Sequence, residues 1–169
     1  MPSTLQLAIV LAMVLSPPAF LAQERAQQTA GQRDVADFYE RTGHRAVWVD
    51  DQGRPTGAAW TVLARLRAAH EDGLDVDDYR GTTLEFEATA LEQGIARASA
   101  DAAAFDVGLT TSALKFLREL HLGRVDPRAL GFHLDHAVEP HDFPALLQSA
   151  TVDHSFEKIV AGLRPQFMQ

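Results

Sequence analysis

Apolar residues in this sequence recur at helical spacing, in segments that end at glycine. Ala59, Val62, Leu63 and Leu66 follow the i, i+3, i+4, i+7 pattern of an amphipathic helix, and Gly73 follows them as a left-handed stop. The same spacing occurs elsewhere, and we expect helices over residues 34–42, 57–72, 83–99, about 101 or 106 to 122, 144–150 and 155–163. This periodicity predicts a mainly α fold, a compact helical bundle-like single domain.

One short segment departs from the helical pattern. Residues 46–49 (Ala-Val-Trp-Val) are rich in β-branched and aromatic side chains, and residues 50–53 (Asp-Asp-Gln-Gly) are typical of a turn. We therefore expect one small extended or turn element near residues 46–55.

The amino end has the composition of a secretory signal. No charged side chain precedes Glu24, and residues 5–15 are apolar at all but one position. This apolar segment is shorter than the roughly 20 residues that span a bilayer. We divide the chain into a signal peptide at 1–22, a flexible polar linker at 23–33 and a helical domain at 34–165. This division predicts a periplasmic or secreted protein that meets the membrane only transiently, through its signal segment. The alternative is that the apolar segment is a helix of the fold, or that the start codon is misplaced.

Charge and cysteine content exclude several classes of protein. The 169 residues include 15 Lys+Arg against 23 Asp+Glu, a formal net charge of −8. A nucleic-acid binder needs a basic surface, so DNA and RNA are not expected partners. The sequence contains no cysteine, which excludes a thiol nucleophile, a disulfide framework and a cysteine-based metal site within it.

Four histidines that lie close together in the sequence are candidate metal ligands. They are His133, His136, His141 and His154, with acidic residues interspersed, and imidazoles with carboxylates can hold zinc or another divalent ion. None of the specific zinc-binding spacings is present, so a polar loop between helices is the preferred interpretation. We expect no cofactor, and we keep a periplasmic divalent-metal-binding protein as the alternative function.

No group of residues in the sequence amounts to a catalytic constellation. Ser112 and Lys115 match a bare Ser-x-x-Lys pattern, but the two motifs that accompany it in acyl-transfer enzymes are absent. Asp77 and Asp78 are adjacent, and adjacent carboxylates do not converge on one substrate atom, so a solvated turn is the preferred interpretation.

Three segments, taken together, resemble a known family. They run from Phe38-Tyr39 through Gly43 to Trp48, from Leu63 through Asp72-Gly73-Leu74 to Tyr79, and from Leu109-Thr110 to Gly123-Arg124-Val125-Asp126-Pro127. Their order and spacing are similar to those of the helical scaffold domain that precedes the catalytic domain in large periplasmic murein L,D-transpeptidases. The resemblance extends over about residues 34–165.

The resemblance implies a cell-wall role without catalysis. The family's reaction is acyl transfer between peptidoglycan stem peptides, with a cysteine attacking the donor and a histidine as its base, and this chemistry belongs to a domain downstream of the scaffold. The present sequence has no cysteine, so no catalytic residue can be assigned in it by resemblance. We expect a non-catalytic scaffold module, a stand-alone or truncated relative of a murein transpeptidase, that binds peptidoglycan or a periplasmic cell-wall enzyme.

A partner surface is expected where an aromatic pair lies beside the turn that follows residue 122. Its residues are Trp48, Tyr79, Arg124 and Asp126, because aromatic rings and arginine are the groups that most often anchor a protein interface. An ordinary helical domain without activity is the third interpretation.

Overall fold

The computed structural model describes residues 19–96, 99–123 and 141–164, with side chains from residue 28 onward. In this part of the chain six α-helices follow one another: α2 (Ala19–Arg41), α3 (Gly57–Arg67), α4 (Gly81–Glu92), α5 (Ser99–Leu122), α6 (Phe143–Asp153) and α7 (Phe156–Leu163). Two short 3-10 helices, η1 (Ala69–Asp72) and η2 (Val76–Tyr79), connect α3 to α4. The described residues form no strand beyond one isolated β-bridge. The mainly α fold is confirmed.

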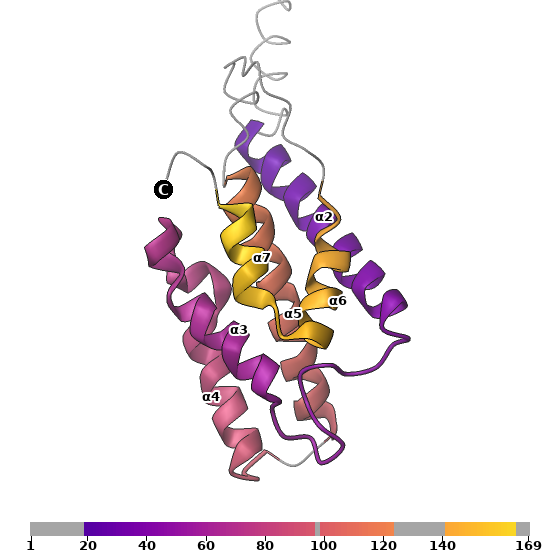
Figure 1. Ribbon diagram of the computed structural model, residues 1–169. Helices are drawn as coiled ribbons and strands as arrows, with labels where there is room; N and C mark the ends of the chain where they lie inside the picture. The colour runs from indigo at the N-terminus through magenta and orange to yellow at the C-terminus, as the bar shows by residue number, and fades with distance from the viewer. Residues whose placement is uncertain (1–18, 97–98, 124–140, 165–169) are drawn as a thin grey trace, which may run out of the picture.

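Helix α5 is the central element of the bundle. It packs against α2, α3, α4, α6 and α7. Figure 1 shows α2 along one side of the molecule, α3 and α4 along the other, and α6 and α7 in front of α5. This arrangement makes α5 the element through which the other helices are held together.

The core is built from every one of these helices. Its largest fully buried side chains are Trp48, Tyr79, Phe38, Phe105, Phe116 and a set of leucines on α3, α4, α5 and α6. Removing one such side chain from water stabilises the fold by about 1.5–3 kcal/mol. The apolar spacing that predicted the helices therefore also predicted which faces they bury.

Local sequence signals determine where α3 begins and how its end connects onward. The Thr56 hydroxyl accepts a hydrogen bond from the Ala59 backbone N–H at 3.2 Å, which caps the first turn. After α3 and η1, Gly73 adopts a left-handed conformation with φ of 73°. The Leu74 N–H then donates to the Ala69 carbonyl oxygen at 3.1 Å, as in a Schellman ending. The expected cap and stop are both confirmed.

The extended element near residues 46–55 is also confirmed. Val49 and Pro55 form an antiparallel bridge. Between them, the Asp50 N–H donates to the Arg54 carbonyl oxygen at 2.8 Å, and the Asp50 side chain accepts from backbone N–H groups inside the turn. The chain reverses here and enters α3, which brings residues 46–49 against α5.

Several boundaries differ from expectation. Helix α3 ends at Arg67, and the last residues of the expected helix 57–72 form the 3-10 helix η1 instead. The segment 23–33, expected as a flexible linker, belongs to α2, because its Gln, Glu, Ala and Arg residues are good helix formers and continue directly into the amphipathic segment from residue 34. Helix α4 ends at Glu92 rather than near residue 99, since Gly94 has a φ of 66° and stops the helix there.

The expected signal peptide lies almost entirely outside the described residues, which begin at residue 19. Among the helices that the structure does describe, none combines the length and the apolar character needed to cross a membrane.

Candidate functional site

A buried carboxylate on α5 joins three parts of the chain. Asp106 is 2% exposed, and its Oδ2 atom accepts hydrogen bonds from the backbone N–H groups of Val47 at 2.9 Å and Trp48 at 2.7 Å. Its Oδ1 atom accepts a hydrogen bond of 2.6 Å from the Tyr39 hydroxyl on α2. The carboxylate therefore fixes both the extended segment and α2 to the central helix.

Thr110, one helical turn after Asp106, completes this network. Its hydroxyl oxygen accepts a hydrogen bond of 2.8 Å from the Trp48 indole N–H and lies 3.1 Å from the Tyr39 hydroxyl oxygen. The indole and Thr110 are both completely buried. Because buried polar groups are costly without partners, this arrangement satisfies the donors that the aromatic side chains take into the core.

The electrostatics of the network follow from burial. Burial raises the pKa of Asp106 above its ordinary value, and the hydrogen bonds from Tyr39, Trp48 and Val47 act in the opposite direction. Burial also raises the pKa of Tyr39, and the neighbouring Asp106 carboxyl adds to that shift. Both oxygens of the carboxyl group are already bonded to protein groups, so the network is suited to holding segments together rather than to exchanging protons with a substrate.

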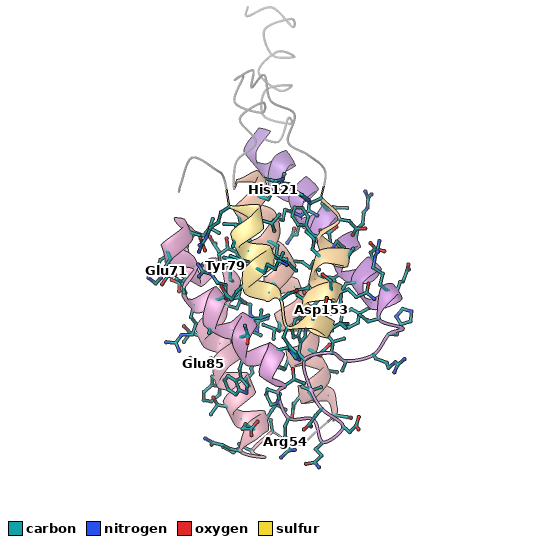
Figure 2. The ribbon with its side chains drawn as sticks, in the orientation of Figure 1. Arg54, Glu71, Tyr79, Glu85, His121 and Asp153 are labelled. Atoms are coloured by element: carbon teal, nitrogen blue, oxygen red, sulfur yellow. The ribbon has the colours of Figure 1, made fainter. Side chains whose placement is uncertain are left out.

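Tyr79 is held in a second polar group on the other side of α5. Its ring is completely buried, and its hydroxyl donates to Glu119 Oε2 at 2.6 Å. The Lys115 ammonium lies 5.4 Å from the ring centroid and donates to the Asp78 carbonyl oxygen at 3.1 Å. Figure 2 shows Tyr79 within the body of the molecule. Lys115 is thus engaged with η2 and Glu119, and not with the Ser112 of the Ser-x-x-Lys pattern.

These positions correct the expected partner surface. The sequence predicts a partner surface that includes Trp48 and Tyr79, but both side chains are 0% exposed and hydrogen-bonded inside the core. Neither can anchor a partner in this conformation, because the same aromatic character that favours an interface also favours burial. Arg124 and Asp126, the other two residues of that surface, lie outside the described residues.

A third network surrounds Asp72, whose side chain is 3% exposed. Its Oδ1 atom accepts a hydrogen bond of 2.6 Å from Arg164 Nε, at the end of α7, and its Oδ2 atom is paired with the buried Arg65 guanidinium of α3. Arg65 also lies 3.2 Å from a Glu71 carboxylate oxygen. The residues paired with Asp72 are 7 and 92 positions away in sequence, so the network ties the end of α7 to α3 and η1.

The four candidate metal ligands do not converge on one ion. His133 and His136 lie outside the described residues. His141 precedes α6 and His154 caps its carboxyl end, and an 11-residue helix separates the two by about 16 Å at 1.5 Å per residue. Within the described ranges, no three His, Asp or Glu side chains are grouped so that they could hold a metal ion. His141 and His154 are therefore too far apart for the four histidines of the alternative interpretation to bind one ion together.

The structure instead pairs His141 with a histidine that the sequence did not single out. His121, in the last turn of α5, has its ring centroid 4.3 Å from that of His141, with the ring planes 76° apart. The two are 20 residues apart in sequence, so no local spacing could have indicated the pair. For Asp106, by contrast, a signal was present, since it lies three residues before Leu109 on the apolar face of its helix.

A small hollow near the start of α3 is lined by residues of α3, α6 and α7. Its lining residues are Trp48, Ala58, Thr61, Val62, Ala150, His154 and Phe156. Its volume is about 10 Å³, which is about the space that one water molecule occupies. The hollow is too small to hold a substrate.

These features define a helical domain in which the described aromatic and charged side chains of the sequence motifs hold the helices together. Comparison with protein families gives the particular class: the model of the Scaffold domain family matches residues 33–169, and the chain belongs to the L,D-transpeptidase scaffold domain family. No curated protein and no solved structure matches the chain.

Proposed function

We propose that this chain is a non-catalytic, cell-wall-associated scaffold module that binds peptidoglycan or a periplasmic cell-wall enzyme. The observation that supports the proposal is the family match over residues 33–169. The described residues of the motifs that resemble the family contribute to the fold here: Trp48 and Tyr79 are buried, and Gly73 follows η1 in a left-handed conformation. These roles agree with a domain that positions other molecules.

The absence of catalysis is part of the same proposal. Acyl transfer in the resembling transpeptidases needs a cysteine thiolate, and the 169 residues contain no cysteine. The buried carboxyl group of Asp106 is bonded to Tyr39 and to two backbone N–H groups. The chain therefore has no thiolate, and the carboxyl group of Asp106 is already engaged by protein groups and is not available as a nucleophile.

The charge of the chain favours a basic partner surface. With a formal net charge of −8, association with an anionic surface is opposed, whereas a basic patch on a cell-wall enzyme is attracted. We therefore favour the enzyme over bare peptidoglycan as the partner. The apolar amino end supports an extracytoplasmic location for this chain, which is where both candidate partners occur.

Binding is tested by retention of the purified, untagged protein on isolated sacculi and by its cross-linking in periplasmic extract. We expect retention in at least one assay, weakened at about 1 M salt because screening shortens the range of charge interactions to about 3 Å. A heat-denatured sample of the same protein serves as the control for binding by unfolded chains. If the folded protein bound in neither of the two assays, the proposed role would be contradicted.

Catalysis is tested separately with purified muropeptides. We expect no cross-linked product from the homogeneous protein. Formation of cross-links by that preparation, at a rate proportional to protein concentration, would show that the chain is an enzyme.

A further inference from the structure

We propose that His121 and His141 together bind a divalent transition-metal ion of the Zn²⁺ or Cu²⁺ class. The two imidazoles come from different elements, His121 from the last turn of α5 and His141 from the residue before the Asp142 cap of α6. Figure 2 places His121 at the end of the molecule opposite Arg54. This site is independent of the proposed cell-wall role, and it differs from the four-histidine interpretation of the sequence.

The separation of the rings is close to that of two imidazoles bound to one ion. The ring centroids are 4.3 Å apart. With metal–nitrogen bonds of about 2.0–2.1 Å and tetrahedral angles, two bound imidazoles have ring centroids about 5 Å apart. The ring centroids therefore need to separate by less than about 1 Å, and the rings, which meet edge to face, need to turn until one nitrogen of each faces the ion. His141 is exposed and precedes α6, so its side chain can make that adjustment.

A buried aromatic ring supports both imidazoles. The Phe143 centroid lies 6.2 Å from that of His121 and 6.3 Å from that of His141, and Phe143 itself is 4% exposed. Phe143 is fixed in the core at the start of α6. The two imidazoles therefore lie against a rigid part of the fold. A site whose ligands are positioned in advance loses less entropy when the ion binds.

Among the described residues, the charged side chains near the pair favour a cation. The Arg118 guanidinium lies over the Phe143 ring and is paired with Asp34, while Arg41 is paired with both Asp37 and Asp142. Two guanidinium groups are thus matched by three carboxylates. The last turn of α5, which contains His121, adds the partial negative charge of a helix carboxyl end.

The ligand chemistry selects the class of ion. Imidazole nitrogen suits Zn²⁺, Cu²⁺ and Ni²⁺, whereas Ca²⁺ and Mg²⁺ require oxygen ligands. Among the described residues the pair supplies two ligands, and with two protein ligands an ion exchanges more readily and is bound less tightly than at a structural site with four. A reversible, accessible metal site follows from this arrangement.

The test is isothermal titration of the untagged full-length protein with ZnCl₂ near neutral pH. We expect saturable binding of one Zn²⁺ per chain. His121→Ala and His141→Ala should each raise the Kd by roughly tenfold or more, at least as much as the loss of an outer-shell partner costs a metal site. His154→Ala and His44→Ala are the matched controls and should leave the Kd unchanged, because both histidines lie outside the pair.

Two further measurements keep the test decisive. Circular dichroism of each variant verifies folding, and His141→Ala addresses the site even if the less exposed His121 proves necessary for the fold. In NMR spectra of the wild type, the imidazole signals of His121 and His141 should shift together with added Zn²⁺. No saturable binding up to about 1 mM Zn²⁺ would overturn the proposal. So would binding that is lost in His136→Ala but unchanged in folded His121→Ala and His141→Ala.

Discussion

Asp106 illustrates at the scale of a single residue how this fold is specified. One buried carboxyl group satisfies two backbone N–H groups of the segment 46–49 and the hydroxyl of Tyr39, although these groups lie on two different parts of the chain. An acidic residue on the apolar face of a helix is costly unless it is fully hydrogen-bonded. Its position on α5 thus makes correct docking of α2 and of the extended segment a condition for a stable core.

Removal of this carboxyl group should strongly destabilise the protein. In Asp106→Ala the N–H groups of Val47 and Trp48 and the Tyr39 hydroxyl lose their acceptor, and we expect the free energy of unfolding to fall by about 3–5 kcal/mol. Asp106→Asn keeps the volume and one acceptor oxygen for the two N–H groups, so its loss should be smaller. Urea unfolding followed by tryptophan fluorescence measures both. An Asp106→Ala variant within about 1 kcal/mol of wild type would contradict the assigned role.

The raised pKa of Asp106 has a defined effect on the pH dependence of stability. Because the pKa is higher in the folded protein than its ordinary 3.8, the folded state keeps this proton to higher pH than the unfolded chain. The contribution of Asp106 to stability is therefore fully present below the ordinary pKa and is lost as the pH rises through the raised pKa. Asp106→Asn should remove this dependence, so the difference in unfolding free energy between wild type and variant should change with pH from about pH 4 upward.

Asp50 is the matched control for that experiment, because its pKa is shifted in the opposite direction. The backbone N–H of Arg54 is the main cause that lowers the pKa of Asp50. Its contribution is present above the ordinary pKa and is lost as the pH falls through the lowered one. The difference between wild type and Asp50→Asn should therefore decrease toward acid. Slopes of the same sign for the two variants would show that one of the two assignments is wrong, and the sign itself would show which one.

At the scale of secondary-structure elements, glycines and caps determine most boundaries. Thr56 begins α3 and Gly73 follows η1, as their residue types predict. Two of the differences in boundaries have a local cause as well. Gly94 was assigned to the interior of a helix that it in fact ends, and the polar segment 23–33 was assigned to a linker although its residue types favour a helix.

The conformational role of Gly73 can be measured directly. Its φ is 73° and no atom lies within 4 Å of an added Cβ, so Gly73→Ala introduces backbone strain without a steric contact. We expect a loss of about 1 kcal/mol. Gly57→Ala is the control, since Gly57 also has open space around it but lies in the first turn of α3 without a positive φ. That variant should be neutral or slightly stabilising. Equal losses in the two variants, measured by thermal or urea unfolding, would exclude the conformational explanation.

At the scale of the whole molecule, the helical class was predictable and the candidate site was not. Periodicity is a local property, and it identified the buried faces of α3 and α5 from residues a few positions apart. Exposure is a tertiary property. Trp48 and Tyr79 have the residue type of interface anchors, yet they are buried because α5 supplies hydrogen-bond acceptors for them. The pairing of His121 with His141 likewise depends on how α5 and α6 are packed.

The network around Asp72 is a second long-range contact, and it connects the end of α7 to the rest of the bundle. Its side chain lies between Arg65 of α3 and Arg164 at the end of α7, and both the Asp72 and Arg65 side chains are more than nine-tenths buried. Asp72→Ala removes the buried partner of Arg65 but leaves the contact with Glu71, so we expect a loss of about 3 kcal/mol, at the lower end of the range for a broken buried pair. The amides of α7 should also exchange hydrogen faster, because the connection at residue 164 is lost.

An exposed ion pair between Arg67 and Glu85 is the control for Asp72→Ala. Glu85 accepts hydrogen bonds from Arg67 at 2.5 and 2.7 Å, but both side chains are at least 36% exposed. Glu85→Ala should therefore cost less than about 1 kcal/mol and leave α7 exchange unchanged. If Asp72→Ala were as mild as Glu85→Ala, the carboxyl end of the bundle would be held by the apolar packing of α7 alone. Since α7 has only eight residues, apolar packing with the buried ion pair is the combination that accounts for its docking.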